Sequence, residues 1–302
     1  MDRLHLMSVF VAVGEEQSFA GAARRLSLSP PAVTRAIAAL ETRLGVRLLN
    51  RTTRHVRVTE AGLRYLDDAR RVIADADAAD EAAGGVNAEP RGHLAVTAPV
   101  LFGKLFVMPG IVDYLQRYPA MEVSAVFLDR VVNLLEEGLD AGIRIGELPD
   151  SSMRAIGVGQ VRRVVCAAPG YLAQHGEPAT PAELARHVIV AASGVSPSLD
   201  WKFTHEGDGA SISVRVKPRL IVTSNDGAIE AVRRGFGLTR LMSYQLAPYL
   251  ASGELTAVLR DYEPPAMPVH VVHREGRHSS AKLRSFLDLI IGRLRAETAL
   301  RA

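Results

Sequence analysis

Apolar positions in the first 45 residues recur every three or four residues, which is the spacing of one face of an α-helix. Short polar segments interrupt the runs twice. The pattern therefore predicts three consecutive helices, Leu4–Val13, Phe19–Leu26 and Pro30–Leu44. Ser18 and Ser29 are placed as N-caps of the second and third helices. Gly14 and Gly45 are placed to end the first and the third.

The third of these helices divides into an apolar face and an outer face. Its apolar residues are spaced by four, three and four positions, which predicts a buried stripe of Val33, Ile37, Leu40 and Leu44. The residues expected on the outer face are Pro30, Pro31, Thr34, Arg35 and Ala38. That face begins at the helix N-terminus, where the positive end of the helix dipole favours a phosphate.

Charge supports a nucleic-acid partner for this end of the chain. Two short extended pieces, Val46–Leu49 and His55–Val58, flank a segment with two arginines and predict a wing. Residues 1–60 contain nine arginines and five carboxylates, whereas the whole chain has a net charge of +3, so the remainder is slightly acidic. Arginine is abundant throughout this chain, however, and surface arginines on amphipathic helices also occur without a nucleic-acid partner.

The ordered combination of capped helices, turn and basic wing carries a family resemblance. The segment SFAGAARRLSLSPPAVTRAIAALETRLGVRLLNRTTRHVRVTEAG resembles the N-terminal domain of LysR-type transcriptional regulators. The resemblance implies a winged helix-turn-helix that reads double-stranded DNA. By position, the groove-facing residues would be Ser29, Pro30, Pro31, Thr34 and Arg35, and the wing contacts Arg51, Thr52 and Arg54. Pro30 stands where many members have glutamine, and proline offers no donor to a base edge.

A long amphipathic helix is expected next. Thr59 can cap a helix that runs to about Ala83, with apolar residues at a period near 3.5. A helix of this length and weak apolar character favours a partner helix, although packing back on its own chain is the alternative. In the resembled family this helix pairs two chains, so the resemblance implies a homodimer and beyond it a homotetramer. Glycine and proline in residues 84–92 predict a hinge.

The last two hundred residues alternate strands with helices, which predicts two α/β lobes. The expected strands are 94–97, 123–128, 141–145, 164–168, 188–192, 218–222 and 269–273. The expected helices are 102–118, 131–138, 170–175, 181–186, 227–234 and 281–295. The resemblance implies the form of a periplasmic binding protein.

The predicted fold is thus α/β, with a winged helix-turn-helix, a long linker helix and a two-lobed effector domain. The expected boundaries are 1–58 for the DNA-binding domain, 59–90 for the linker and 91–302 for the effector domain. Within the effector domain, lobe I is expected over 91–162 and 269–302, and lobe II over 163–268.

A small effector is expected at the carboxyl ends of the strands, where open α/β sheets bind their ligands. The expected contacts, which also match effector segments of the family by position, are Pro99, Val100, Leu101, Phe102, Gly146, Ser193, Val195 and Asn225. The apolar character of Val100 and Leu101 favours an aromatic or partly apolar ligand. A place in the core is the alternative for both residues.

Catalytic and metal-binding patterns are missing from the sequence. It contains no GxSxG, P-loop, HExxH or paired CxxC motif, so we expect neither an enzyme nor a cofactor. The single cysteine, Cys166, lies in an apolar run and is expected to be buried. His270 and His273 are three positions apart on a predicted strand and would face opposite sides, which is unsuited to one metal ion.

No apolar stretch approaches the length of a membrane span, and no signal-peptide pattern precedes the first helix, so we expect a cytoplasmic protein with no membrane partner. Two other functions remain open at this point. An enzyme with a helical appendage would use the α/β half for catalysis. A sensor that never touches DNA would use only the effector domain.

Overall fold

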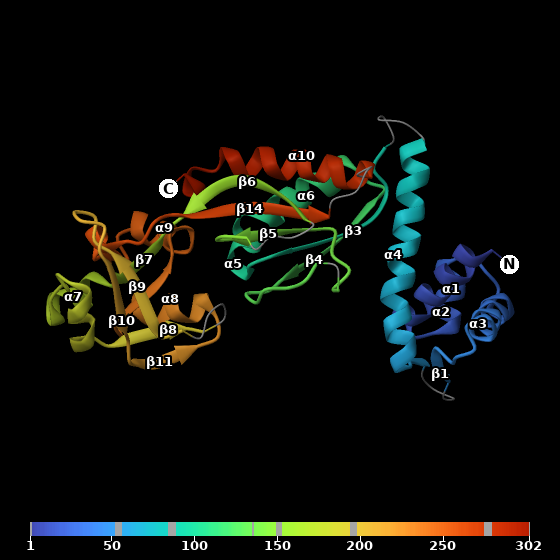
Figure 1. Cartoon of the computed structure of the whole chain (residues 1–302), viewed down its shortest axis with the longest axis horizontal. Coiled ribbons are helices and arrows are strands. Elements are labelled where there is room, and N and C mark those ends of the chain that lie inside the picture. The colour runs from blue at the N-terminus through green and yellow to red at the C-terminus, as the bar shows by residue number, and fades with distance from the viewer. Residues whose placement is uncertain are drawn as a thin grey trace. The chain divides into compact units, whose positions relative to one another are not determined.

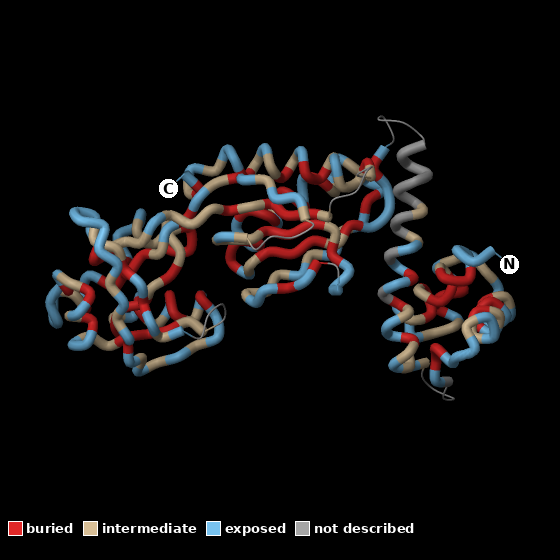
Figure 2. The backbone as a smooth tube through the Cα atoms, viewed as in Figure 1, coloured by how far each residue is buried: buried red, intermediate tan, exposed pale blue. Residues whose placement is uncertain are grey.

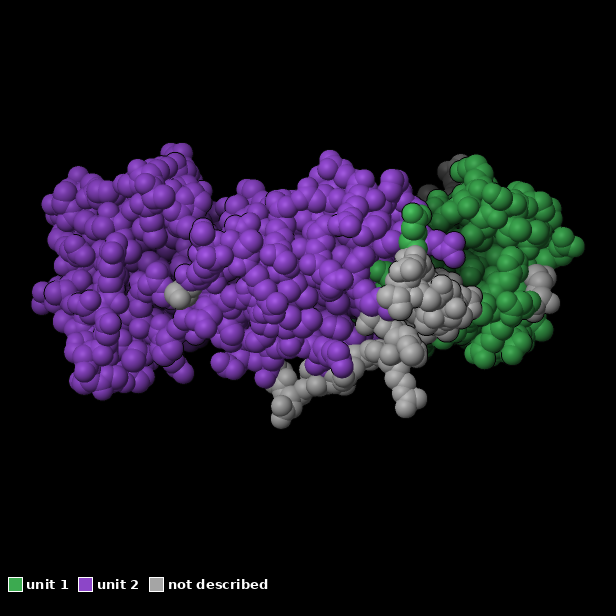
Figure 3. Space-filling view, turned by 90° about the horizontal axis from the view of Figure 1, so that it is seen from above, with its two compact units in different colours: residues 1–89, 133–138, 276–281 green, residues 90–132, 139–275, 282–302 purple. Residues whose placement is uncertain are grey.

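The computed structural model describes residues 2–51, 56–83, 89–134, 136–148, 153–193, 198–274 and 280–301. It divides into two compact units (Figure 3), one formed mainly by residues 1–89 and the other mainly by residues 90–302. Each unit is described by itself.

The first unit is a three-helix domain with a two-stranded wing and a long final helix (Figure 1). Its elements are α1 (Arg3–Glu16), α2 (Phe19–Arg25), α3 (Pro30–Leu44), β1 (Leu49–Arg51), β2 (Val56–Val58) and α4 (Glu60–Ala83). The apolar faces of α1, α2, α3 and the start of α4 enclose one core, seen as buried segments in Figure 2. Phe10 and Ile37 have no exposed surface at its centre.

The predicted N-caps Ser18, Ser29 and Thr59 are confirmed, because each side chain accepts a hydrogen bond from an amide in the first turn of its helix. Ser18 Oγ accepts the Gly21 amide at 3.1 Å, and Ser29 Oγ accepts the Ala32 amide at 3.4 Å. Thr59 Oγ1 accepts the Gly62 amide at 2.9 Å at the start of α4.

The predicted end of the first helix at Gly14 is wrong, since α1 continues to Glu16. A Cβ at Gly14 would lie 3.2 Å from Leu66 Cδ1, so this glycine allows α4 to approach α1 closely. The helix ends instead where Gln17 takes the left-handed conformation, with φ of 47°.

The wing strand predicted over 46–49 is also displaced, because β1 begins only at Leu49. The carboxylate of Glu41 accepts the amides of Leu48 and Leu49 at 2.8 and 3.1 Å, and Thr59 Oγ1 donates to the carbonyl of Arg47 at 2.9 Å. These bonds hold the segment on the end of α3, so its polar groups are not free for strand pairing.

One carboxylate joins three helices of the first unit. Glu15 on α1 pairs with Arg25 of α2 at 2.6 Å and with Arg70 of α4 at 2.8 Å. Burial raises the pKa of Glu15, but the hydrogen bonds from Arg25 and Arg70 outweigh it and hold the pKa below its ordinary value of 4.5.

Glu15→Gln is expected to destabilise the first unit by about 1 kcal/mol near neutral pH, the upper range for solvent-screened pairs. Because the folded-state pKa of Glu15 is depressed, its contribution is present above pH 4.5 and is lost as pH falls through the folded-state pKa. Hydrogen exchange of α1 amides in the full chain should show a difference between variant and wild type that closes in acid. Glu60→Gln, at an exposed pair with Arg64, is the control, and equal effects of both changes would contradict the assignment.

The second unit contains two five-stranded sheets, which define its two lobes. Lobe I has the order β4-β3-β5-β14-β6. Its elements are β3 (Gly92–Ala98), α5 (Val100–Phe102), α6 (Met108–Arg117), β4 (Met121–Phe127), β5 (Ala141–Ile145), β6 (Met153–Val161), β14 (Met267–Arg274) and α10 (Ala281–Ala296). Strands β3, β4 and β5 are parallel, whereas β14 runs antiparallel to β5 and β6.

Lobe II has the order β11-β8-β12-β7-β13, with a separate hairpin of β9 and β10. Its elements are β7 (Arg163–Ala167), α7 (Pro169–His175), β8 (Ile189–Ala192), β9 (Asp200–Thr204), β10 (Ser211–Arg215), β11 (Pro218–Val222), α8 (Asn225–Arg233), β12 (Leu238–Met242), α9 (Ser243–Ala251) and β13 (Thr256–Val258). The chain passes from lobe I to lobe II between β6 and β7, where Arg162 is the single connecting residue, and returns along β14.

The helix predicted over 131–138 is wrong, because none of the described residues in that stretch is helical. Arg144 Nη2 donates to the carbonyl of Val132 at 2.7 Å, which occupies an acceptor that a helix would use. The predicted helix 102–118 is one continuous helical segment that starts at Val100, with a π-helical turn at Gly103–Val107. Predicted helix 181–186 is a 3-10 helix.

Candidate functional site

The outer face of α3 is exposed as its spacing predicted. Pro30, Pro31, Thr34, Arg35 and Ala38 are all exposed, as is the N-cap Ser29. Val33, Ile37 and Leu40 on the opposite face are buried against α1 and α2. The helix is therefore held firmly by one side while the other side is free for a partner.

The polar groups of this face differ in how far the protein already uses them. Thr34 Oγ1 donates to the carbonyl of Pro30 at 3.1 Å, so its remaining capacity is as an acceptor. An acceptor there suits an amino group of adenine or cytosine in the major groove. Within the described part of the chain, Arg35 has no carboxylate partner, so its guanidinium is available to an external anion.

The wing is described only in part. Arg51 ends β1 opposite Val56, while Thr52 and Arg54 lie outside the described residues. Strand register also pairs Asn50 with Arg57, which is exposed between two half-buried valines. Sequence reasoning missed Arg57 as a wing residue, although the alternation Val56-Arg57-Val58 indicates a strand with the arginine on its outer side.

In the effector domain, one carboxylate links the two lobes. Asp129 follows β4 of lobe I, and its Oδ1 accepts the amide of Val100 at 3.0 Å. Its Oδ2 accepts Nδ2 of Asn225 at 3.3 Å, at the start of α8 in lobe II. Asn225 is 8% exposed, so the bond closes over a largely buried amide. Sequence reasoning missed Asp129, although an acidic residue directly after a parallel strand is a recognisable signal.

The other predicted effector residues fall into two groups. Phe102 and Leu101 lie in the core, since Phe102 has no exposed surface and its ring packs 5.3 Å from that of Tyr244. Phe102 therefore presents no surface to solvent in this structure, and its contact with an effector stays a prediction. Burial, with Asp129 adding to it, raises the pKa of Tyr244 above its ordinary value of 10.

Two of the remaining predicted residues, Gly146 and Ser193, use their backbone amides within the fold. The amide of Gly146, at φ of +106°, donates to the carbonyl of Pro268 at 2.8 Å. The amide of Ser193 donates to the carbonyl of Val222 at 2.8 Å. Pro99 is half-buried and Val100 is exposed, whereas Val195 lies outside the described residues.

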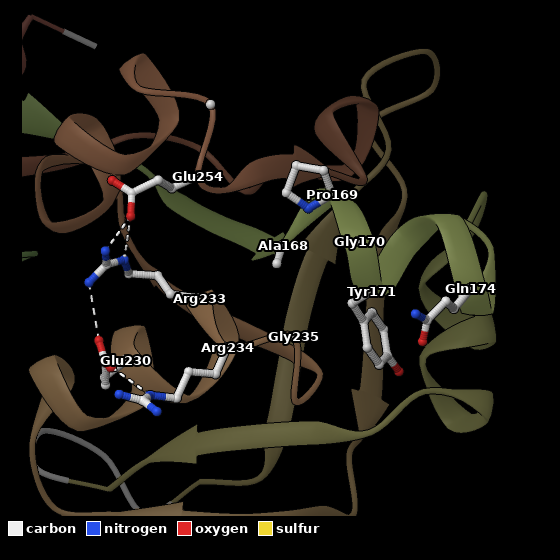
Figure 4. Close-up of a pocket in the computed structure, with 11 residues that line it drawn as sticks. Ala168, Pro169, Gly170, Tyr171, Gln174, Glu230, Arg233, Arg234, Gly235 and Glu254 are labelled. Carbon is white, nitrogen blue, oxygen red and sulfur yellow. Dashed lines mark hydrogen bonds and ion pairs between the residues drawn. The ribbon is translucent and has the colours of Figure 1, made fainter.

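A separate surface cleft of about 570 Å³ lies in lobe II between α7 and the end of α8 (Figure 4). Arg233 pairs with Glu230 and Glu254 there, and Arg234 pairs with Glu230 at 2.7 Å. The two arginines and two glutamates neutralise one another. No predicted effector residue lines this cleft, so its size alone does not make it the effector site.

Among the described residues, no cluster of histidine, cysteine and carboxylate side chains could hold a metal ion. Cys166 is buried, and burial raises the pKa of its thiol to about 12. Over the same residues, no helix combines the length and apolar character that crossing a bilayer requires.

Comparisons with known proteins agree with this arrangement. Residues 4–63 match the family described as bacterial regulatory helix-turn-helix protein, lysR family, and residues 87–295 match the LysR substrate binding domain. A transcriptional repressor of Pseudomonas aeruginosa (strain UCBPP-PA14) is 32% identical over 96% of this chain and 92% of its own length.

Solved full-length structures show the same fold. CrgA of Neisseria meningitidis, a LysR-type transcriptional regulator, is 30% identical and aligns over 96% of this chain and 98% of its own, with a TM-score of 0.61. AphB, a virulence activator of Vibrio cholerae, is 26% identical over 96% of this chain and 99% of its own, with a TM-score of 0.62. The chain belongs to the LysR family of DNA-binding transcriptional regulators, which join a helix-turn-helix to a two-lobed effector-binding domain.

Proposed function

We propose that the outer face of α3 and the wing bind operator DNA. The observation that carries this proposal is the exposed guanidinium of Arg35 in the N-terminal half of α3, which has no carboxylate partner among the residues that the structure describes. In this proposal Arg35, Arg51 and Arg54 bind phosphates or groove edges. Ser29 and Thr34 position or read bases, and Pro30, Pro31 and Thr52 contact the DNA surface. Arg57 on the wing adds a further cation.

The test is fluorescence anisotropy of the full chain with DNA from directly upstream of its own gene, across a salt series. We expect binding that is specific for one segment and weakens as salt rises, because phosphate contacts release counterions. Equal, salt-sensitive binding to any sequence would place the target elsewhere in the genome. No binding at any salt concentration would contradict the DNA proposal.

A small, partly apolar effector binds between the lobes, where the side chain of Asp129 in lobe I bonds to that of Asn225 in lobe II. This proposed effector site is called the mouth. Exposed Val100 supplies apolar surface beside these polar groups, and that combination suits an aromatic ligand with one polar end. A ligand that replaces the Asp129–Asn225 bond changes the relative free energies of lobe arrangements, which is the way a bound molecule shifts a conformational equilibrium. Pro99, Gly146, Ser193 and Val195 belong to the proposed surroundings of this mouth.

Asp129→Ala is expected to raise the exchange rate of the Val100 amide at least tenfold, because the variant removes that amide's acceptor. A compound that shifts the DNA-binding curve of the wild-type chain identifies the effector. In Asn225→Ala the same compound should no longer shift the curve. Asp226→Ala removes a neighbouring exposed carboxylate and should keep both properties. Unchanged Val100 protection, or a response retained without Asn225, would contradict the proposed mouth.

We further propose that α4 pairs two chains, that two such pairs form a tetramer, and that the protein acts in the cytoplasm, where its DNA lies. One face of α4 packs on the first unit of the same chain, since Leu66 and Ala69 are buried there. Leu63 and Val72 remain 54% and 43% exposed, which supports a partner helix. Sedimentation of a monomer at micromolar concentration would contradict this assembly. We also propose that the DNA-binding domain spans residues 1–58, the linker residues 59–90 and the effector domain residues 91–302.

A further inference from the structure

A second, smaller pocket lies where the chain crosses between the lobes. Its volume is about 300 Å³, and its walls include Arg162, the start of α9 and the C-terminal segment Thr298–Arg301. The crossover is fixed by two reciprocal bonds, since the Arg162 amide donates to Ser243 Oγ at 3.1 Å and the Ser243 amide donates to the Arg162 carbonyl at 2.8 Å. None of the residues proposed for DNA or effector contact lines this pocket.

The charges around this pocket do not balance. Arg162 Nη1 pairs with Glu263 Oε2 at 2.5 Å, so that arginine is neutralised. Arg260 and Arg301 also line the pocket, and neither has a carboxylate partner within the part of the chain that the structure describes. Two unneutralised guanidinium groups beside one pocket favour an anion, and their planar donors match a carboxylate.

The floor of the pocket is apolar. Val164 and Ala257 are 2% and 8% exposed, and Ala247 and Leu250 of α9 are half-buried. An inorganic anion would leave this floor in contact with water, whereas a ligand with a hydrocarbon body would cover it. A volume of about 300 Å³ suits a small ligand, of the size of a substituted benzoate or a short fatty acid.

We propose that this pocket binds a small monocarboxylate with an aromatic ring or short hydrocarbon chain, its acid group on Arg260 and Arg301 and its body on α9. The segment Thr298–Leu300 follows α10, which packs on lobe I, where a Cβ at Gly110 would lie 2.7 Å from Ile290 Cδ1. Helix α9 belongs to lobe II. An occupied pocket therefore stabilises one arrangement of the lobes at their crossover, and it does so independently of the mouth at Asp129.

The test uses the full chain and isothermal titration with 4-methylbenzoate, benzoate, cyclohexanecarboxylate and octanoate. We expect saturable binding of at least one acid, and at least tenfold weaker binding of 4-methylbenzamide than of 4-methylbenzoate, because the amide lacks the charge. Arg260→Gln with Arg301→Gln should weaken acid binding at least tenfold. Arg215→Gln with Arg219→Gln removes two exposed arginines of the same lobe and should leave it unchanged.

A variant that fills the pocket tells whether the acid binds here or at the mouth between the lobes. Ala247→Met should abolish acid binding, with unchanged circular dichroism and DNA affinity as the folding controls. Asn225→Ala should leave acid binding intact. Loss of binding in Asn225→Ala with retention in the Arg260/Arg301 double variant would place the acid at the mouth and overturn this inference. Absence of saturable binding for all four acids would overturn it as well.

Discussion

Replacing Arg35 by alanine is expected to lower the affinity for operator DNA by more than tenfold at fixed salt. The guanidinium is exposed on the outer face of α3 and has no carboxylate partner among the described residues, so no internal ion pair competes with the DNA. The fold should be unaffected, because Val33 and Ile37 on the opposite face hold the helix. Anisotropy at several salt concentrations measures the effect.

The salt series also separates two roles of Arg35. Loss of a phosphate contact weakens binding to all sequences alike and lowers the salt slope by about one, whereas loss of a base contact relaxes specificity at one position. Arg186→Ala, which removes the same charge from an exposed position in the effector domain, should leave the affinity within about threefold. Equal losses in both variants would mean that net charge, rather than this contact, governs binding.

The second large effect is expected at Gly62, in the first turn of α4. A Cβ at this position would lie 2.1 Å from the carbonyl oxygen of Leu48, a distance that side chains do not tolerate. Since Leu48 is held by Glu41, the backbone there has little room to move. Gly62→Ala should therefore destabilise the first unit by at least ~2 kcal/mol, at the upper end of overpacking effects.

Hydrogen exchange of α1 and α3 amides in the full chain measures this loss, and DNA affinity should fall with it. Gly292→Ala is the matched control, because that glycine also lies in a helix and a Cβ there meets no atom within 4 Å. We expect the control to be neutral or stabilising by about 0.5–1 kcal/mol. Wild-type protection in Gly62→Ala would show that the segment around Leu48 yields to the added carbon.

Features set by a few neighbouring residues were predictable from sequence. The caps at Ser18, Ser29 and Thr59 each require one side-chain oxygen three residues before an amide, so the helix starts follow from local pattern. The buried and exposed faces of α3 follow from its spacing. Strands β5 and β11 have the predicted bounds, 141–145 and 218–222.

Features set by distant residues were not predictable in this way. Apolar residues at 131–138 suggested a helix, but Arg144 from the next strand binds the carbonyl of Val132. The bond between Asp129 and Asn225 joins positions 96 residues apart, and no local pattern pairs them. The burial of Phe102 was likewise not predictable, because the ring that covers it belongs to Tyr244, far along the sequence. The strands β6, β9, β10, β12 and β13 also escaped the sequence pattern.

Cys166 has a practical consequence for spectroscopy. It is the single cysteine of the sequence, it has no exposed surface, and a thiol with a pKa of about 12 contains almost no thiolate near neutral pH. Maleimide dyes should therefore leave the native chain unlabelled without any prior cysteine removal. Arg24→Cys in the first unit and Arg186→Cys in the second would introduce the reactive positions, both at exposed sites. Energy transfer between two such dyes would then follow how the units move when DNA or an effector binds.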